Sequence, residues 1–238
     1  MNRRAVITGG ARGIGAAIAA RLHADGFHVT VLDIAKPEEA TGQFIRVDLS
    51  DAEATRAACA AIASDGPVGC LVNNVGIVVP AALEDVALTD FDRLFHINLR
   101  ASLIAAQTFV PGMKAAGHGR IVMNTSRVTL GKELRSLYSA TKGAAQSMAR
   151  TWALELAPFG ITVNCVAPGP IATRTFWQNN PPHSPRTRAI IDRVPMGRMG
   201  TGEDVAQAVA FFCDRRSGFI TGQTVYVCGG VTVGLAGG

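Results

Sequence analysis

The sequence predicts one α/β domain built on a doubly wound parallel sheet with helices on both faces. The chain has 238 residues, a length that suits a single domain of this class. Hydrophobic residues make up 48% of the chain and charged residues 17%, so it can bury a large core. Apolar runs of strand length alternate with longer helical patterns, which is typical of parallel strands buried on both faces.

Strands and helices are expected to alternate along the whole chain. The apolar runs predict strands at residues 4–8, 28–33, 44–49, 70–75, 120–126, 162–167 and 224–228. Helices are expected from the glycine-rich turn to about residue 24, after residue 51, at 89–112 with an interruption allowed for, at 138–157 and at 203–213. Gly26 is placed to cap the first helix, Ser50 or Asp51 to begin the second, and Pro158 and Gly160 to end the helix before them.

Charge argues against a nucleic-acid-binding protein. The formal net charge of +5 comes mostly from arginines that are scattered along the chain. A nucleic-acid-binding protein more often gathers its basic residues on one face or tail. We therefore prefer a solvated basic surface, which also attracts an anionic cofactor or substrate.

The cysteines and apolar segments indicate a cytoplasmic protein without a membrane segment or metal site. No two cysteines have the spacing of metal ligands or a redox pair, and an odd, dispersed set favours a reducing compartment. Arg12 and nearby glycines interrupt the N-terminal stretch that could pass for an export signal. The uncharged stretch 66–83 contains Pro67 and Pro80, which favour a buried strand and loop. The cysteines are Cys59, Cys70, Cys165, Cys213 and Cys228.

A glycine-rich turn, residues 8–15 (TGGARGIG), lies between the first strand and the first helix. Glycines permit a tight turn there and let the backbone approach a pyrophosphate, while the helix N-terminus offers free N–H groups. Any tight turn between a strand and a helix can use glycine, so the turn alone is weak evidence. Its position after a strand and before a helix predicts a Rossmann-type dinucleotide site.

Asp33 ends the second strand, where an acid can bind the ribose hydroxyls of the cofactor. Its carboxylate would repel the 2′-phosphate of NADP, and Ile34 and Ala35 supply no compensating arginine. Arg12 argues mildly for NADP. We give Asp33 more weight and expect NAD, with NADP as the alternative, although Asp33 could also be an ordinary aspartate at a strand end.

Tyr138 and Lys142 lie four residues apart on a predicted helix and therefore share one face. A ketone that accepts hydride needs a proton, and an alcohol that loses hydride must release one. A tyrosine with its ordinary pKa near 10 is a poor base at neutral pH, but a nearby lysine cation favours the phenolate. A tyrosine and a lysine at this spacing occur in many helices, so the pair is evidence only in combination with the other motifs.

These motifs occur in an order that resembles the short-chain dehydrogenase/reductase family from Arg4 to Gly230. The turn resembles the family's TGxxxGxG, and residues 138–142 resemble its YxxxK. Residues 73–76 (NNVG) resemble NNAG with Val75 in place of alanine, residues 96–99 (HINL) carry the family's helix asparagine, and residues 168–173 (PGPIAT) resemble PGxIxT. Asp48 and Leu49 resemble a pair that contacts adenine, and Ser126 follows the fifth strand.

The resemblance implies the role of each site residue. Tyr138 would be the general acid and base, Lys142 would lower its pKa and hold the nicotinamide ribose, and Ser126 would polarise the substrate oxygen. Asn98 would hold a water that relays protons to Lys142. The expected cofactor-binding residues are Gly9, Arg12, Gly13, Ile14, Gly15, Asp33, Asp48, Leu49, Asn74, Val75, Gly76, Tyr138, Lys142, Pro168, Gly169, Ile171 and Thr173.

Two features depart from the family pattern. Ser126 and Tyr138 are twelve positions apart, one fewer than is common in relatives, so Thr125 and Ser136 are rival hydroxyls. Arg127 stands where a small or apolar residue is usual. It is either solvated or directed toward the substrate.

The substrate side is expected to include a mobile lid over residues 173–198, a region rich in proline and arginine. Phe176 and Trp177 would form an apolar wall or pack the lid onto the body, and a continuous helix is disfavoured by the prolines. The opposite side is expected at Val78, Val79, Leu130 and Leu134. A mostly apolar ketone or secondary alcohol is the expected substrate.

Three other functions fit the sequence less well. Relatives also reduce carrier-bound 3-oxoacyl thioesters with NADPH, but Phe159 replaces a basic residue that such reductases often carry. Sugar epimerases and dehydratases space the glycines differently and have a larger C-terminal region. A catalytically silent NAD-binding protein would commonly lack Tyr138 or Lys142. By resemblance we also expect a homodimer or homotetramer formed through helices 90–113 and 138–157, where Ala105, Ala144 and Ala145 would permit close packing.

Overall fold

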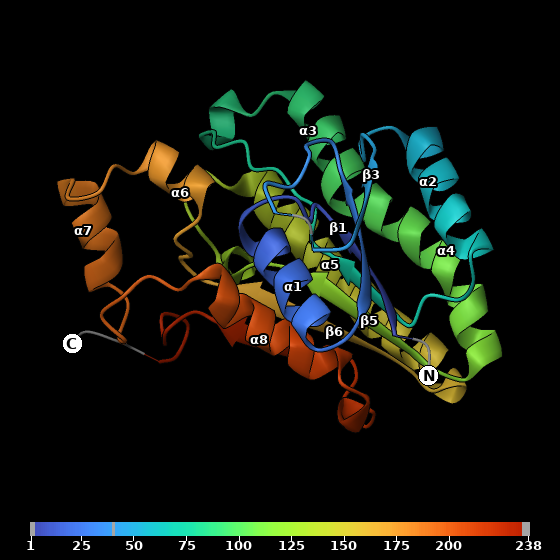
Figure 1. The fold of residues 1–238 in the computed structure, drawn as a ribbon. Helices are drawn as coiled ribbons and strands as arrows, with labels where there is room; N and C mark the ends of the chain where they lie inside the picture. The colour runs from blue at the N-terminus through green and yellow to red at the C-terminus, as the bar shows by residue number, and fades with distance from the viewer. Residues whose placement is uncertain (1–2, 40, 235–238) are drawn as a thin grey trace.

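The computed structural model describes residues 3–39 and 41–234, and these contain a seven-stranded parallel sheet (Figure 1). The strand order is β3-β2-β1-β4-β5-β6-β7, so the order reverses between β1 and β4, where the ends of the strands open a crevice for a ligand. The strands are β1 (Arg4–Thr8), β2 (His28–Asp33), β3 (Gln43–Arg46), β4 (Cys70–Asn73), β5 (Gly119–Asn124), β6 (Ile161–Pro168) and β7 (Thr224–Val227).

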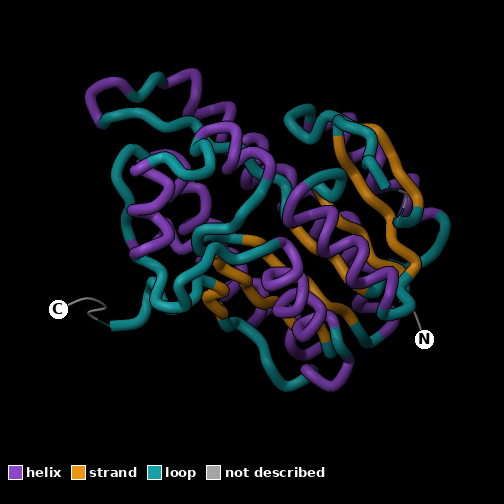
Figure 2. The backbone as a smooth tube through the Cα atoms, turned by 60° about the vertical axis from the view of Figure 1, so that its left-hand side comes forward, coloured by secondary structure: helices purple, strands orange, loops and turns teal. Residues whose placement is uncertain are grey.

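Helices cover both faces of the sheet, as the apolar strands require (Figures 1 and 2). One face packs on α1 (Gly13–Ala24) and α8 (Gly202–Cys213), and these helices contact each other. The other face packs on α2 (Ala52–Ser64), α4 (Ala101–Ala116) and α5 (Ser136–Leu156). Two separate buried clusters fill the two layers, so the expected fold class is confirmed.

The expected helix starts are explained by local capping. Asp51, rather than Ser50, is the N-cap of α2, and its carboxylate accepts from the amides of Glu53 and Ala54. Thr201 and Asp204 form a capping box at the start of α8. Each cap satisfies amides that have no partner in the first turn of the helix.

Three strands end two or three residues earlier than expected. β3 ends at Arg46, β4 at Asn73 and β5 at Asn124, instead of residues 49, 75 and 126. After β4, the amides of Asn74 and Val75 both donate to the hydroxyl of Thr8 rather than to a neighbouring strand. Side chains past the strand ends are thereby free to line one edge of the sheet.

The long helical stretch expected at 89–112 divides into three pieces. These are α3 (Leu88–Phe95), a π-helical turn over His96–Arg100, and α4, which continues past Pro111 to Ala116. The prediction that Ala105 and Ala145 serve contacts between subunits is wrong. Both are buried in the cluster under the sheet, so they pack within the chain.

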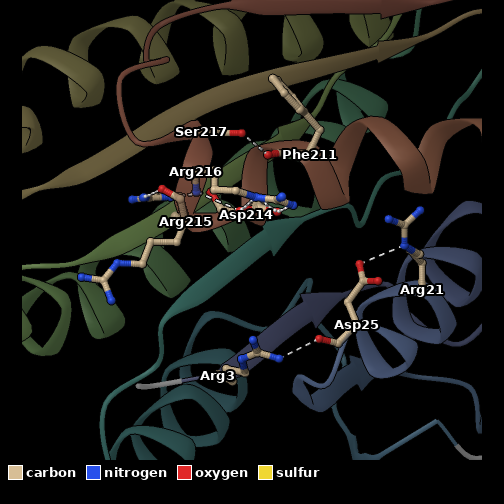
Figure 3. Close-up of polar contacts among 9 residues, drawn as sticks. Arg3, Arg21, Asp25, Phe211, Asp214, Arg215, Arg216 and Ser217 are labelled. Carbon is tan, nitrogen blue, oxygen red and sulfur yellow. Dashed lines mark hydrogen bonds and ion pairs between the residues drawn. The ribbon is translucent and has the colours of Figure 1, made fainter.

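Charged residues at the opposite, amino-terminal edge of the sheet are held by partners (Figure 3). Arg21 pairs with Asp25 at 2.9 Å, and Arg3 donates to the carbonyl oxygen of Asp25 at 2.9 Å. Arg216 forms a two-pronged pair with Asp214, with a shortest distance of 2.6 Å. These three arginines are therefore already satisfied by the protein.

Two further findings concern the described residues only. None of their helices combines the length and the apolar character that a membrane crossing requires. They contain no group of three or more His, Cys, Asp or Glu side chains that could hold a metal ion.

Candidate active site

The glycine-rich turn joins β1 to α1 at the carboxyl edge of the sheet. Gly9 and Gly13 have φ angles of +65° and +54°, in the left-handed region that favours glycine. A Cβ on Gly15 would lie 2.1 Å from the carbonyl oxygen of Gly9, so no larger residue fits there. The N-cap, Arg12, makes no side-chain capping bond, so the first amides of α1 remain available as donors. This cradle suits a pyrophosphate.

Residues after β4 and β5 brace the turn. The side-chain amide of Asn74 donates to the carbonyl oxygens of Thr8 and Gly9, at 3.1 and 2.8 Å. The amide of Asn124 in turn donates to Asn74 Oδ1 at 2.7 Å. Three adjacent strand ends are thus tied together, and Asn74 acts in the structure as a support for the turn.

Two aspartates follow β2 and β3. Asp33 accepts from the amides of Ala11 and Ala35, each at 3.0 Å, which fixes its carboxylate beside the glycine turn. Asp48 accepts from the amide and hydroxyl of Ser50, and these bonds lower its pKa. Hydrogen bonds thus orient both carboxylates, and Asp48 stays ionised at neutral pH.

Lys142 is only 4% exposed, and its ammonium group donates to the carbonyl oxygen of Asn124 at 2.8 Å. Its Nζ lies 5.7 Å from the ring centroid of Tyr138. The Ser126 side chain lies close enough to the Tyr138 hydroxyl to favour its ionised form. Because Ser126 is also the N-cap of the turn Arg127–Leu130 and accepts from Val128 N at 3.3 Å, its hydroxyl is held in place.

Burial dominates the pKa values of this pair. It lowers the pKa of Lys142 to about 8, since the charged ammonium loses its hydration. It also raises the pKa of Tyr138, against the smaller lowering effects of Ser126 and Arg135. This net upward shift is opposite to the lowering that we expected from Lys142. Tyr138 is therefore a protonated donor at neutral pH.

Asn98 lies in the π-helical turn and is 2% exposed. Its Oδ1 accepts from Ile77 N at 2.8 Å, and its Nδ2 donates to Ile77 O and Thr141 Oγ1 at 3.0 and 3.1 Å. A Cβ on Gly76 would lie 3.1 Å from Lys142 Nζ and 3.3 Å from Asn98 Oδ1. Gly76 therefore leaves the space between these two polar groups open. π-turns of this kind are common at functional sites.

The rival hydroxyls are placed elsewhere. Thr125 is buried, and its hydroxyl donates to the carbonyl oxygen of Val166 at 3.1 Å, on the side of β6. Ser136 is exposed at the start of α5. Of the three hydroxyls, Ser126 is the one that acts on Tyr138, so the structure favours it over both rivals.

The segment after β6 returns to the glycine turn. Gly169 N donates to Val227 O at 2.8 Å, and a Cβ on Gly169 would lie 2.7 Å from the Cα of Cys228. Thr173 caps the short helix α6 (Arg174–Asn179), and its methyl group would be 3.4 Å from a Cβ on Gly13. The remaining predicted cofactor residues in apolar positions are buried or half-buried along this edge: Ile14, Leu49, Val75, Pro168 and Ile171.

The expected lid contains two short helices, α6 and α7 (Pro185–Asp192), with a proline-containing break between them (Figure 1). The break at the prolines agrees with the expectation that no continuous helix spans this segment. Phe176 and Trp177 are half-buried and form an edge-to-face pair with centroids 5.1 Å apart. Across the site, Val78, Leu130 and Leu134 have exposed side chains.

Sequence reasoning missed three residues of the site. Asn124 holds both Lys142 and Asn74, and Thr141 bonds Asn98. Arg193, at the end of α7, acts electrostatically on Arg127. The asparagine at the end of β5 was a usable signal, whereas the approach of Arg193 to Arg127 depends on the path of the lid.

Comparisons with known proteins agree with this geometry. Residues 9–232 match the family described as enoyl-(acyl carrier protein) reductase. An L-xylulose reductase from Mesocricetus auratus is 35% identical over 243 residues, which cover 97% of each chain. The structure of ElxO with NADP bound has a TM-score of 0.90 and 28% identity, covering 97% of this chain and 99% of that one.

A solved structure described as a short-chain dehydrogenase/reductase family protein is 33% identical, with a TM-score of 0.85, and covers 98% of this chain and all of that chain (100%). The matches extend over nearly the whole sequence, and the strand order, glycine turn and tyrosine–lysine helix lie within them. The chain therefore belongs to the short-chain dehydrogenase/reductase family, oxidoreductases that transfer hydride between a nicotinamide cofactor and a secondary alcohol or ketone.

Proposed function

We propose that Tyr138 is the general acid and base of this enzyme and that Ser126 holds the substrate oxygen. The observation that carries the proposal is the placement of the Ser126 side chain close enough to the Tyr138 hydroxyl to favour its ionised form, at the carboxyl edge of the sheet. A carbonyl oxygen placed between them would receive a hydrogen bond from Ser126 and a proton from Tyr138. The nicotinamide, when bound, supplies or accepts the hydride.

Lys142 and Asn98 support this chemistry from the buried side. The ammonium group of Lys142 would hold the nicotinamide ribose, and its charge would stabilise the Tyr138 phenolate. Asn98 would hold a water in the space that Gly76 leaves open, so that protons pass between solvent and Lys142. Buried groups with shifted pKa values, such as Lys142, are typical of active sites.

The direction of the Tyr138 shift sets the pH dependence. Protonated Tyr138 donates in reduction, so kcat/KM for reduction should be constant at low pH and fall as the pH rises through the pKa of Tyr138. Oxidation needs the phenolate and should increase over the same range. We infer that reduction is favoured at neutral pH.

The test is the Tyr138→Phe variant, which keeps the ring and removes the hydroxyl. Turnover of any ketone substrate should fall by roughly 100-fold or more, because the proton donor is lost. Binding of NADH, followed by its fluorescence, should be unchanged and so shows that the site is intact. Turnover close to that of the wild type would refute the assignment.

For the cofactor, we propose a preference for NAD over NADP. Asp33 places a fixed carboxylate beside the turn, where the adenosine ribose of a bound dinucleotide would lie. Its charge would accept hydrogen bonds from ribose hydroxyls and repel a 2′-phosphate. The NADP seen in ElxO belongs to that protein. A wild-type kcat/KM that is higher for NADPH than for NADH would mean that Arg12 outweighs Asp33.

For the substrate, we propose a ketone whose body is mostly apolar, enclosed by a lid over residues 173–198. The two ends of the lid are joined to each other. Ile171 and Gly200 form a β-bridge, Ala172 N donates to Gly200 O at 2.8 Å, and Gly200 N donates to Pro170 O at 3.0 Å. Met196 N also donates to Gly229 O at 3.2 Å, so the expected movement is confined to α6 and α7 and need not disturb the sheet. Val78 would face Phe176 and Trp177 across the substrate.

We also propose a cytoplasmic homodimer or homotetramer that forms through α4 and α5. The support is the exposure of apolar residues on these helices, Leu103 on α4 and Leu154 on α5. Solution scattering at micromolar concentration should give a mass of two or four chains. A monomeric mass would reject the assembly.

A further inference from the structure

Arg127 lies at the junction of three segments around the active site. It follows Ser126 and begins the turn Arg127–Leu130. The charged or titratable groups that act on its guanidinium include Cys228, after β7, and Arg193, at the end of α7 in the lid. The side chain is half-buried, and burial is the largest cause that lowers its pKa. The end of the lid packs on the segment after β7, where Met196 N donates to Gly229 O at 3.2 Å. Because Arg127 directly follows Ser126, its guanidinium would lie near the remote part of a substrate whose carbonyl is held at Ser126.

The described part of the chain provides no carboxylate for this group. Its five ion pairs engage other arginines: Arg21, Arg56, Arg174, Arg198 and Arg216. Arg193 makes the imbalance larger, because a second positive charge acts on Arg127 and also lowers its pKa. A partly desolvated cation beside a like charge lowers the stability of the free protein. Such an arrangement favours a bound anion.

Cys228 is the alternative partner for Arg127. Its thiol lies 3.2 Å from Thr232 Oγ1, and hydrogen bonds from Thr232, Gly230 and Val231 lower its pKa. A thiolate there would partly neutralise Arg127. It would not supply the two coplanar acceptors that the guanidinium fork matches.

We propose that Arg127, assisted by Arg193, binds an anionic group on the substrate, a carboxylate or a phosphate, while the substrate carbonyl lies at Ser126 and Tyr138. This inference rests on the proposed function and narrows its substrate class to oxo acids or phosphorylated ketones with an apolar body. Because Arg193 belongs to the lid, the same anion would draw the lid toward the catalytic loop.

The test compares charged and neutral members of matched ketone pairs. The pairs are 2-oxobutyrate, acetoacetate and levulinate, each with its methyl ester, and hydroxyacetone phosphate with hydroxyacetone. The three acids vary the distance from carbonyl to carboxylate, and the fourth pair separates phosphate from carboxylate. In the wild type, at least one charged member should exceed its neutral partner in kcat/KM by about tenfold or more.

Substitution of Arg127 should remove this preference. Arg127→Ala should lower kcat/KM for the favoured anion by about 10- to 100-fold and change the neutral partner by less than about threefold, because hydrogen bonds to charged groups are lost only in the anion. Arg127→Lys should recover part of the loss, since it keeps the charge without the fork. Arg193→Ala should give a smaller loss, mainly in KM. Arg56→Ala, which removes an exposed arginine on α2, is the matched control.

Three results would overturn the inference. The first is equal loss on both members of a pair in Arg127→Ala, which would indicate a structural role. The second is the same loss in Cys228→Ser, which would mean that Arg127 serves the thiolate. The third comes from calorimetric titration of the enzyme–NAD⁺ complex with the same acids and phosphate: no binding, or binding unchanged in Arg127→Ala. The titration judges the anion site even if none of these ketones is reduced, whereas the Tyr138→Phe test judges the proposed function.

Discussion

The two edges of the sheet treat charge in opposite ways. At the amino-terminal edge, Arg120 is 3% exposed, and its guanidinium donates to the carbonyl oxygens of Gly119, Gly160, Asp214 and Arg215. At the carboxyl edge, Lys142 is equally buried but donates to a single acceptor among the described residues, Asn124 O. Arg120 therefore has acceptors for its N–H groups within the fold, whereas the Lys142 ammonium keeps N–H groups available for a ligand. We infer that Arg120 supports stability, while Lys142 costs stability in exchange for chemistry.

Arg120→Met gives the largest expected effect on stability. The change removes the donors of four carbonyl oxygens and leaves these acceptors short of partners near the sheet edge. The free energy of unfolding should fall by about 2–4 kcal/mol. Urea unfolding followed by circular dichroism measures it. A loss below about 1 kcal/mol would show that the backbone can be satisfied by water and that the two edges do not differ as proposed.

Lys142→Met should have the opposite sign at neutral pH. The pKa of Lys142 falls from 10.5 to about 8 on burial, so its charge destabilises the folded state below pH 8. The variant should be more stable than the wild type by about 1–3 kcal/mol at pH 7 while losing turnover. Between about pH 8 and 10.5, the unfolded wild type binds more protons than the folded form, so the wild type gains stability as the pH rises and the difference should shrink. A variant that is less stable at pH 7 would contradict this account.

The comparison of the two sheet edges also shows which parts of the molecule the sequence alone could predict. The alternation of apolar runs determined the sheet and its two layers, because strands buried on both faces leave a strong local signal. The glycine turn and the Tyr138–Lys142 spacing were visible for the same reason, since each depends on neighbours within one element. The structure then brought Ser126, Tyr138, Lys142 and Asn98 to one edge of the sheet, as the pattern suggested.

What the sequence did not predict depends on contacts between distant segments. Ala105 and Ala145 were expected at a subunit contact, but small residues pack equally well under a sheet, and only the fold decides between the two. The upward shift in the pKa of Tyr138 depends on how deeply the loops bury it. Arg193 approaches Arg127 across 66 residues of chain, a relation that no local pattern contains.

Asp33 and Asp25 allow the comparison of edges to be repeated with acids. Asp33→Ser should raise kcat/KM with NADPH relative to NADH by about tenfold, because the charge that opposes a 2′-phosphate is lost. Asp25→Ser removes the partner of Arg21 at the other edge and should leave this cofactor ratio unchanged. Steady-state kinetics on one ketone measures both. An equal ratio in all three proteins would remove Asp33 from cofactor choice, and Arg12→Ala would then test whether Arg12 sets it.

The smallest expected effect concerns motion of the lid, where the carboxyl edge differs again from the rest of the molecule. β6 is buried along its whole length, whereas much of the segment between Ile171 and Gly200 is exposed. A contact that joins the lid to the body is the exposed pair Arg174–Glu38 at 3.2 Å, which contributes little. We therefore expect lid amides to exchange hydrogen quickly in the free enzyme and more slowly with NAD⁺ and a bound anion, while β6 stays protected throughout. Thr187 is buried within the lid and donates to Pro181 O at 2.9 Å, so α7 should move as a unit, with its slower exchange appearing over several adjacent amides. Hydrogen exchange followed by mass spectrometry separates the outcomes. High protection in the free enzyme, unchanged by ligand, would identify residues 173–198 as a permanently packed loop held by Phe176 and Trp177.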